Sequence, residues 1–274
     1  MHELIFGLSL MVGTLSMVAG GPSDLAAEPT NADEAAAAKV AAEAELDAKY
    51  QAWVATLTPE QQAWEIVLQE NLGDFYLPLH KQNKVDGKSN AWDFVADKWG
   101  MPRVLLIGDS ISRGYTQAVR KALEGKANVH RAPANCGPTA MGIKKLDIWL
   151  GDGKWDVIHF NFGIHDRHTP IADYAHRLEQ LIIRLQKTGA KLIWASSTPI
   201  PDLPEEKYFA ASIVERNQVA EKLMQKYGIV IDDLFTAVTP HLAVLQNAHD
   251  VHFKGEGYDF LGKQVAASIE AVME

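Results

Sequence analysis

Residues 104–112 read Val-Leu-Leu-Ile-Gly-Asp-Ser-Ile-Ser, an apolar run that ends in a glycine turn followed by two serines. A short apolar run without polar alternation indicates a strand that is buried on both faces, as in a parallel sheet. Ser110 then lies just past the carboxyl end of that strand, where open α/β sheets place their ligands. Because Gly-Asp-Ser is also a common turn sequence, the tripeptide alone leaves a purely structural role open.

Similar apolar runs recur beyond residue 102 and alternate with longer segments of helical period. The runs of strand length cover residues 104–107, 129–132, 157–162, 191–196 and 229–231. Between the third and fourth runs, apolar residues recur at steps of three and four, at Tyr174, Leu178, Leu181, Ile182 and Leu185. This alternation predicts a three-layer α/β/α sandwich with a central parallel sheet of about five strands. A final amphipathic helix carries Phe260, Leu261, Val265, Ile269 and Val272.

A second chemical signal, Asp250-Val251-His252, stands near the end of the chain. A serine hydroxyl is a poor nucleophile at neutral pH, so it needs an imidazole within hydrogen-bond reach and a third group to orient that imidazole. In an irregular loop a carboxylate two residues before a histidine can reach its Nδ1, which makes Asp250 the candidate third group for His252. A helix cap or a solvated loop charge is the alternative for Asp250, and Asp232 and Asp233 are less suitable substitutes.

From about residue 102 to the end, these motifs resemble the SGNH, or GDSL-like, hydrolase family, which has four short blocks in a fixed order. Residues 108–112 resemble the first block, which carries the nucleophile, here Ser110. Residues 135–139, Asn-Cys-Gly-Pro-Thr, resemble the second, with Gly137 as the glycine of the oxyanion hole. The resemblance implies an SGNH or flavodoxin-like fold.

The third and fourth blocks depart from the family pattern. In residues 163–166, Gly-Ile-His-Asp, His165 stands where the family has an asparagine that donates to the oxyanion. In the last block the family places an aspartate three residues before the histidine, whereas Asp250 is two before His252 and His249 fills the usual place. An imidazole N–H can replace the asparagine donor if its tautomer is right, so His165 is a candidate. A hydrogen bond from His165 to a neighbouring loop is the alternative.

The resemblance implies a serine ester hydrolase that acts through an acyl-enzyme without metal or organic cofactor. Ser110 would attack, His252 would move the proton, and Asp250 would orient His252. The oxyanion hole would consist of the backbone N–H groups of Ser110 and Gly137 with the His165 side chain. Asn135 and Asn161 are reserve donors.

An acyl ester is therefore the expected substrate. Exported family members commonly deacetylate polysaccharides, which favours acetyl or other short acyl groups on carbohydrate. Lipase-like or arylesterase activity is the next expectation from the resemblance. An acyltransferase, or a carbohydrate-binding module that kept the fold without the chemistry, remains open.

The N-terminal segment predicts export. An apolar run over residues 4–19 is followed by small residues, as in a signal peptide over residues 1–20, so a secreted or periplasmic protein is expected. His2 and Glu3 stand where a lysine or arginine is usual, which leaves a short membrane anchor, a misplaced start codon or a buried first helix as alternatives. The run is too short for a comfortable span, so no stable membrane span is expected after signal removal.

Residues 21–101 are expected to form a tether and a helical extension before the hydrolase domain of residues 102–274. Residues 29–50 are rich in alanine with charged residues, a composition of high helix propensity. Thr58-Pro59-Glu60-Gln61 is typical of a helix start. Aromatic residues in 75–79 and 92–99 are expected to pack on the main domain, with sugar stacking as the alternative.

Composition sets further bounds. The 274 residues, 47% of them hydrophobic, suffice for one large core, and a net charge of −9 without a basic block argues against nucleic acid as the main ligand. The single cysteine, Cys136, excludes an intrachain disulfide, and a catalytic thiol would need a base that the sequence does not indicate. No metal site is expected from the histidines between residues 159 and 168, because they include no helical His-x-x-x-His pair.

Overall fold

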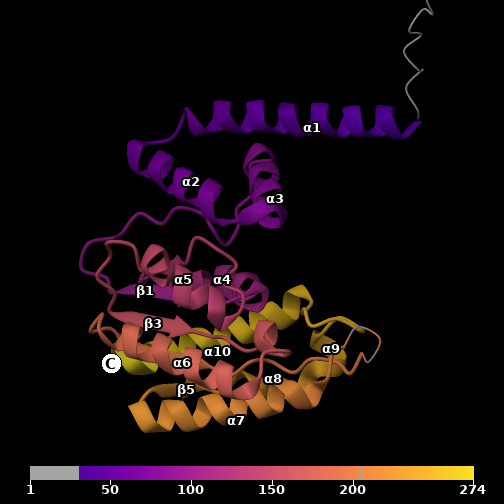
Figure 1. Ribbon diagram of the computed structural model, residues 1–274. Coiled ribbons are helices and arrows are strands. Elements are labelled where there is room, and N and C mark those ends of the chain that lie inside the picture. Colours follow the sequence, from indigo (N-terminus) through magenta and orange to yellow (C-terminus); the bar gives the residue numbers. More distant parts are fainter. Residues whose placement is uncertain (1–30, 204, 206) are drawn as a thin grey trace, which may run out of the picture. The chain divides into compact units, whose positions relative to one another are not determined.

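The computed structural model describes residues 31–203, 205 and 207–274 (Figure 1). Contacts divide the chain into two units, residues 1–44 and 45–274. The first described helix, α1 (Asn31–Val54), continues across that boundary, so the alanine-rich segment is helical as its composition predicts. The predicted signal peptide lies outside the described residues. None of the helices within the described ranges is both long and apolar enough to cross a membrane.

A parallel sheet of five strands forms the centre of the unit 45–274, which confirms the predicted fold class. The strands are β1 (Arg103–Ile107), β2 (Asn128–Arg131), β3 (Val157–Phe160), β4 (Lys191–Ala195) and β5 (Val230–Asp232). Their spatial order is β2-β1-β3-β4-β5, and every neighbouring pair is parallel. Because β1 pairs with both β2 and β3, the turn that follows β1 lies next to the turns that follow those two strands.

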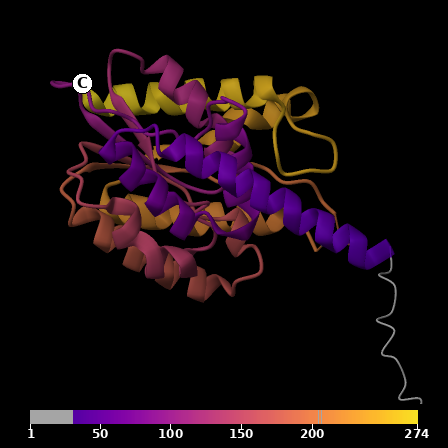
Figure 2. The ribbon, with the colours of Figure 1, turned by 90° about the horizontal axis from the view of Figure 1, so that it is seen from above.

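Helices cover both faces of the sheet. Val104 and Leu106 of β1 join the core on one face, and Leu105 and Ile107 join the core on the other, as the two-residue period of a strand requires. On the first face lie α4 (Ser110–Ala122) and α10 (Gly255–Met273); on the second lie α5 (Thr139–Leu150), α6 (Ile171–Gln186) and α7 (Ala210–Tyr227). Figure 2 shows α10, in yellow, on one side of the sheet and α6 and α7 on the other.

The predicted apolar stripe of α6 is fully buried. Its members are Tyr174, Leu178, Leu181, Ile182 and Leu185, each 0% exposed. Burying such a stripe removes a continuous apolar surface from water, at roughly 25 cal/mol per Å². This packing fixes the loop between β3 and α6, which carries the third family-like block.

Helices α4 and α10 approach each other closely because glycines stand at their contact. A Cβ atom on Gly114 would lie 2.0 Å from the Tyr258 ring, and one on Gly262 would lie 2.4 Å from the Cβ of Ala118. Only glycine fits at these positions. The loop that precedes α10 is thereby held beside the start of α4, where Ser110 lies.

The shorter elements before α10 complete this side of the molecule. They are α8 (Leu234–Val238), η3 (Thr239–His241) and α9 (Leu242–Leu245). A single antiparallel bridge between Gln246 and Phe253 then closes the loop that contains Asp250 and His252. Within it the backbone N–H of Asn247 donates to the carbonyl of His252 at 3.0 Å.

The helical extension consists of α2 (Pro59–Asn71) and α3 (Gly73–Val85). The predicted start of α2 is a complete capping box, in which Gln61 N donates to Thr58 Oγ1 and Thr58 N donates to Gln61 Oε1. Arg120 of α4 joins this extension to the sheet domain, since it donates to the carbonyls of Asn90 and Asp93 and to that of Val129 in β2. Of the aromatic residues expected to pack on the main domain, Trp92 is buried between the extension's helices and Arg131 of β2, whereas Phe75 and Trp99 are 70% and 101% exposed, so the expectation is wrong for those two.

Candidate active site

Ser110 is the first residue of α4, and Asp109 is its N-cap. The Oδ1 of Asp109 accepts a hydrogen bond from Ile111 N at 2.9 Å, which satisfies one of the free donors of the helix start. A Cβ atom on Gly108 would lie 2.6 Å from the Cβ of Ser112, so glycine is required for this tight turn between β1 and α4. The side chain of Ser110 thus lies at the carboxyl edge of the sheet, as the sequence predicts.

Ser110, His252 and Asp250 form one chain of hydrogen bonds. The Oγ of Ser110 lies 2.9 Å from Nε2 of His252, and Nδ1 of His252 lies 2.8 Å from Oδ1 of Asp250. A proton on Nδ1, held by the carboxylate, leaves Nε2 as the acceptor for the serine proton. The structure therefore brings together the three residues that the sequence singles out for nucleophile, base and orienting acid.

Asp250 remains a carboxylate over a wide pH range. Desolvation raises its pKa, but hydrogen bonds from the imidazole and the backbone N–H of His252 outweigh that effect and hold the pKa below its usual value of 3.8. The charged form is therefore the one that faces His252 at neutral pH.

The substitute acids have other partners. Asp232 is fully buried and pairs with Nε2 of His159 at 3.0 Å. Asp233 caps α8 through Thr236 N and accepts a hydrogen bond from Ser196 Oγ. His249 stands in the left-handed backbone region with φ +55°, one residue before Asp250. Only Asp250 is bonded to His252 among these acids.

The loop with Gly137 is attached to the nucleophile turn. The backbone N–H of Cys136 donates to the carbonyl of Gly108 at 3.1 Å. Gly137 has φ +59°, a conformation that favours glycine, and it leads directly into α5. The turn after β1 and the loop after β2 therefore meet beside Ser110.

His165 reaches the same edge from η1 (Ile164–Asp166), the short 3₁₀ turn after β3. Its Nε2 lies 3.9 Å from Oδ2 of Asp109, and its side chain is 36% exposed. The imidazole is thus beside the nucleophile turn and accessible from solvent. A Cβ atom on Gly163 would lie 1.9 Å from Ser197 Oγ, so glycine is needed where this loop leaves β3.

The two reserve donors differ in their surroundings. The amide nitrogen of Asn161 donates to the carbonyl of Ala195 at 2.8 Å and to Ser197 Oγ at 3.1 Å, so its donors already serve to join β3 and β4. The Oδ1 of Asn135, an acceptor, is buried and has no hydrogen-bond partner in the described part of the chain, whereas the oxyanion would need a bond from its amide N–H. Of the two side chains, that of Asn161 is already hydrogen-bonded to other residues, so Asn135 is the better reserve candidate.

Two further residues support this site although the sequence did not predict them as parts of it. Arg131 of β2 donates through Nη2 to the carbonyls of Gly108 and Asp109, at 2.9 and 3.0 Å, and through Nη1 to Ser112 Oγ at 2.7 Å. The available signal is an arginine inside an apolar strand run, because a buried guanidinium requires several acceptors.

The second is Asp166, the last residue of the third family-like block, to which the sequence alone assigns no role. Its fully buried carboxylate accepts hydrogen bonds from the backbone N–H and the hydroxyl of Thr139, at 2.7 and 2.8 Å, and from Thr169 Oγ1. Asp166 therefore joins the His165 loop to the start of α5, just after Gly137.

The environment of Cys136 disfavours a reactive thiol. The side chain is fully buried, and burial raises its pKa to about 12. The neutral thiol is then the species present at physiological pH. Within the described ranges, no group of three or more His, Cys, Asp or Glu side chains could hold a metal ion.

Residues 106–260 match the model of the GDSL-like lipase/acylhydrolase family, which is more than half of the chain. The chain belongs to this family. Its membership, with the SGNH fold, makes the protein a carboxylic ester hydrolase. The match begins within β1 and ends within α10, so it contains all four blocks but not the helical extension.

Solved structures agree on the fold of this GDSL-like hydrolase. A lipase/acylhydrolase from Enterococcus faecalis superposes with a TM-score of 0.57 at 21% identity, covering 63% of this chain and 97% of that one. The acetyl xylan esterase AlAXEase superposes with a TM-score of 0.54 at 15% identity, covering 61% of this chain and 99% of that one. Axe2, an acetylxylan esterase from Geobacillus stearothermophilus, superposes with a TM-score of 0.53 at 16% identity, covering 61% of this chain and 94% of that one. No curated protein sequence matches the chain.

Proposed function

We propose that this hydrolase is exported and removes acetyl or other short acyl groups from carbohydrate through an acyl-enzyme on Ser110. The observation that carries the proposal is the hydrogen bond from Ser110 to His252, with Asp250 on the far side of the imidazole. That arrangement is what an activated serine needs.

Each of the three hydrogen-bonded residues has a distinct role in the reaction. His252 takes the proton as Ser110 Oγ attacks the acyl carbonyl, and it then protonates the alkoxide that leaves. Water enters in the second half-reaction, activated by the same imidazole, and releases the carboxylic acid. Asp250 keeps the proton on Nδ1 and balances the charge of the imidazolium.

The negative charge on the tetrahedral intermediate requires donors next to Ser110. The backbone N–H groups of Ser110 and Gly137 and the imidazole of His165 are the proposed oxyanion hole. The link from Cys136 to Gly108 supports this set, because it holds the Gly137 loop against the turn that carries the serine. His165 would act here in place of the family's asparagine.

An open site supports a substrate in which the ester lies on a large molecule. The side chains of His252 and Asp250 are 38% and 42% exposed, so the ester can reach them from the surface. An acetyl group needs little room beyond the oxyanion hole. Two of the structural neighbours described above are acetyl xylan esterases, which favours acetylated polysaccharide over lipid. Export rests on the sequence of residues 1–20.

Hydrolysis of nitrophenyl acetate by the purified protein tests the mechanism. Ser110→Ala and His252→Ala should each lower turnover on the order of 10³-fold or more. His249→Ala is the matched control, because this histidine is three residues from His252 and outside the hydrogen-bond chain; its turnover should stay near that of the parent. Full activity of Ser110→Ala would refute the mechanism.

Substrate class is tested on acetylated and deacetylated xylan. The parent protein should release free acetate from the acetylated polymer, and Ser110→Ala should not. If acetate appears only bound to an added sugar, the acceptor is a hydroxyl group and the protein is a transferase. Turnover confined to long-chain esters would contradict the assignment to short acyl groups.

A further inference from the structure

A cavity of about 300 Å³ lies along the edge strand β2, and Ser110, His252 and Asp250 are not among its lining residues. One wall comes from the extension, with Trp64 of α2 and residues 93–97; the opposite wall is residues 148–155, the end of α5 and the loop before β3. The floor includes His130 and Arg131 of β2. Its volume is at the lower end of the roughly 300–1,000 Å³ of small-ligand sites.

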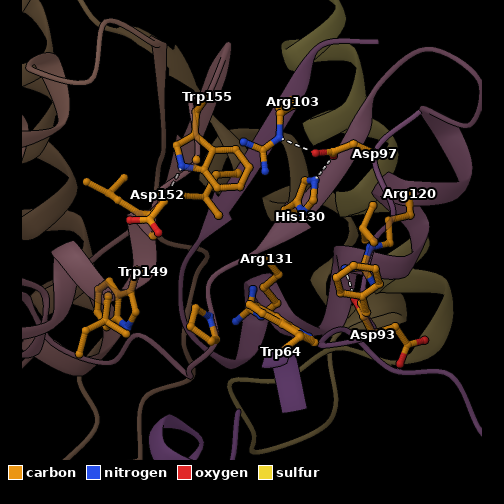
Figure 3. Close-up of a pocket in the computed structure, with 18 residues that line it drawn as sticks. Trp64, Asp93, Asp97, Arg103, Arg120, His130, Arg131, Trp149, Asp152 and Trp155 are labelled. Carbon is orange, nitrogen blue, oxygen red and sulfur yellow. Dashed lines mark hydrogen bonds and ion pairs between the residues drawn. The ribbon is translucent and has the colours of Figure 1, made fainter. Parts of the chain in front are cut away.

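We propose that this cavity binds a neutral sugar residue, as a non-catalytic site. Figure 3 shows the arrangement of its side chains: Trp64, Trp149 and Trp155 stand around the space together with charged groups from several elements. The Trp64 indole and the Phe94 ring can offer apolar faces to the C–H face of a sugar, whereas Trp149 is 3% exposed and supports the wall from behind. Charged side chains offer donors and acceptors to the hydroxyl groups of the sugar.

The aromatic part of the cavity is held in place. Trp64 is half-buried, and its Nε1 donates to the carbonyl of Trp92 at 2.7 Å. Trp155 donates to the carbonyl of Leu150 at 2.9 Å, and the guanidinium of Arg103 covers its ring at 4.4 Å. Phe94 adds a ring that is 37% exposed. Rings fixed in this way lose little entropy when a ligand binds.

The charges lining the cavity are balanced, which favours a neutral ligand. Three carboxylates, of Asp93, Asp97 and Asp152, face three guanidinium groups, of Arg103, Arg120 and Arg131. Asp97 is already paired with His130 at 2.7 Å and with Arg103 at 2.9 Å. A phosphate or a cationic ligand would find no surplus of opposite charge, whereas a hydroxyl group can both donate and accept.

One buried donor behind the cavity floor lacks an acceptor. Arg131 is 2% exposed, and its Nε has no hydrogen-bond partner among the residues that the structure describes. The Nη bonds to Gly108, Asp109 and Ser112 fix the plane of the guanidinium and therefore the direction of the Nε–H. Neighbouring atoms cover this Nε, so the exposed rings and the balanced charges, and not this donor, are what a sugar in the cavity would contact.

The site depends on the extension that is outside the family match. Trp64 and residues 93–97 precede residue 106, where the match begins. Arg120 fixes this wall to the sheet through its bonds to Asn90, Asp93 and Val129. Without the extension the cavity would lose one wall, so this chain adds a sugar site to a fold that is complete without it.

Binding is tested separately from catalysis, in the full-length Ser110→Ala protein. Xylohexaose, cellohexaose and chitohexaose, none of which carries an acyl ester, are titrated into it by isothermal calorimetry. At least one should bind with a dissociation constant in the millimolar range or tighter. Because no probe carries an acyl ester, binding is measured without turnover. Failure to bind leaves the esterase assignment intact, and failure of that assignment leaves the binding result interpretable.

Variants locate the binding. Asp152→Ala removes an exposed carboxylate from the rim and should weaken binding about tenfold, as expected for a hydrogen bond to a charged group. Trp64→Ala should weaken it at least as much. Trp99→Ala is the matched control, since Trp99 is fully exposed and outside the cavity lining; its affinity should equal that of the parent.

Three results would overturn the proposal: no binding of any probe at low millimolar concentration, unchanged affinity in both cavity variants, or an equal loss in Trp99→Ala. Thermal unfolding of each variant checks that it is folded. If Trp64→Ala is not folded, Asp152→Ala decides the outcome alone, because its side chain lies on the exposed loop between α5 and β3.

Discussion

The guanidinium of Arg131 donates a hydrogen bond to the carbonyl oxygen of Asp109 at 3.0 Å and so holds the backbone immediately before Ser110. A second bond from the same Nη2 reaches the carbonyl of Gly108 at 2.9 Å. Burial lowers the pKa of Arg131, yet its charge is met here by carbonyl and hydroxyl oxygens. Arg131 is therefore a positioning residue for the nucleophile turn, since it acts through the backbone of that turn.

Arg131→Met should lower kcat for nitrophenyl acetate by about 10²-fold and change KM little, because a small displacement of a reacting group has effects of that size. Arg131→Lys should retain more activity than Arg131→Met, since a lysine can reach one of the acceptors but not all three. Steady-state kinetics on both variants provide the measurement.

Stability must be measured alongside, because a buried arginine also supports the fold. Urea unfolding of the two variants at the temperature of the assay separates the effects. If kcat is unchanged while the free energy of unfolding falls, the role of Arg131 is structural and the positioning argument is wrong.

Asp250→Asn should lower kcat, though less than Ser110→Ala by roughly one to two orders of magnitude. The amide can still contact Nδ1 of His252, but it neither fixes the tautomer nor balances the imidazolium charge. Asp233→Asn is the control, since Asp233 caps α8 and does not contact His252. A greater loss in Asp233→Asn would move the orienting role to that residue.

The stability contributed by Asp250 should depend on pH in a defined direction. Its pKa is lowered in the folded protein, so the contribution is present above the ordinary pKa of 3.8 and is lost as pH falls through the folded value. The difference in free energy of unfolding between parent and Asp250→Asn should thus shrink as the pH falls below about 3.8. It should be small, because this carboxylate is 42% exposed. A difference that grows as the pH falls below 3.8 would contradict the direction.

His165→Asn restores the residue that the family has at this position, and His165→Ala removes the side-chain donor. The alanine variant should lose about 10²-fold to 10³-fold in kcat, the usual effect of removing one oxyanion donor, and the asparagine variant should lose less. Kinetics with nitrophenyl acetate measure both. If both variants keep activity close to that of the parent, the third donor of the oxyanion hole is not His165. Asn135 would then be the next residue to substitute.

Most of the fold is readable from the sequence because its strands are buried on both faces. The run predicted at residues 104–107 is β1 with one residue added, and the run at 191–196 is β4 with one removed. The apolar stripe of α6 is equally predictable from the sequence, since a helix packed on a sheet must present one continuous apolar face. Short-range rules also give the capping box at Thr58, which depends only on neighbouring residues.

The sequence predicts only those site residues that lie in the loops at the carboxyl edge of the sheet. Ser110 and His252 are identifiable from short motifs, and parallel strands then bring their loops together. The bonds of Arg131 to the nucleophile turn join different strands through side-chain conformation, which no local pattern encodes. The use of the Asn161 amide between β3 and β4, and the cavity against the extension, depend on packing in the same way.

Cys136 should be unreactive in the native protein although it adjoins Gly137. A thiol with a pKa of about 12 is ionised only to about one part in 10⁴ at pH 8, and its side chain is fully buried. Ellman's reagent at pH 8 should therefore label Cys136 slowly in the native state and rapidly in urea. Cys136→Ala should keep kcat within about threefold of the parent, since the bond to Gly108 comes from the backbone N–H and survives the substitution. Rapid labelling of the native protein together with loss of activity would instead favour a catalytic thiol, and the hydrogen bond between Ser110 and His252 would then need another explanation.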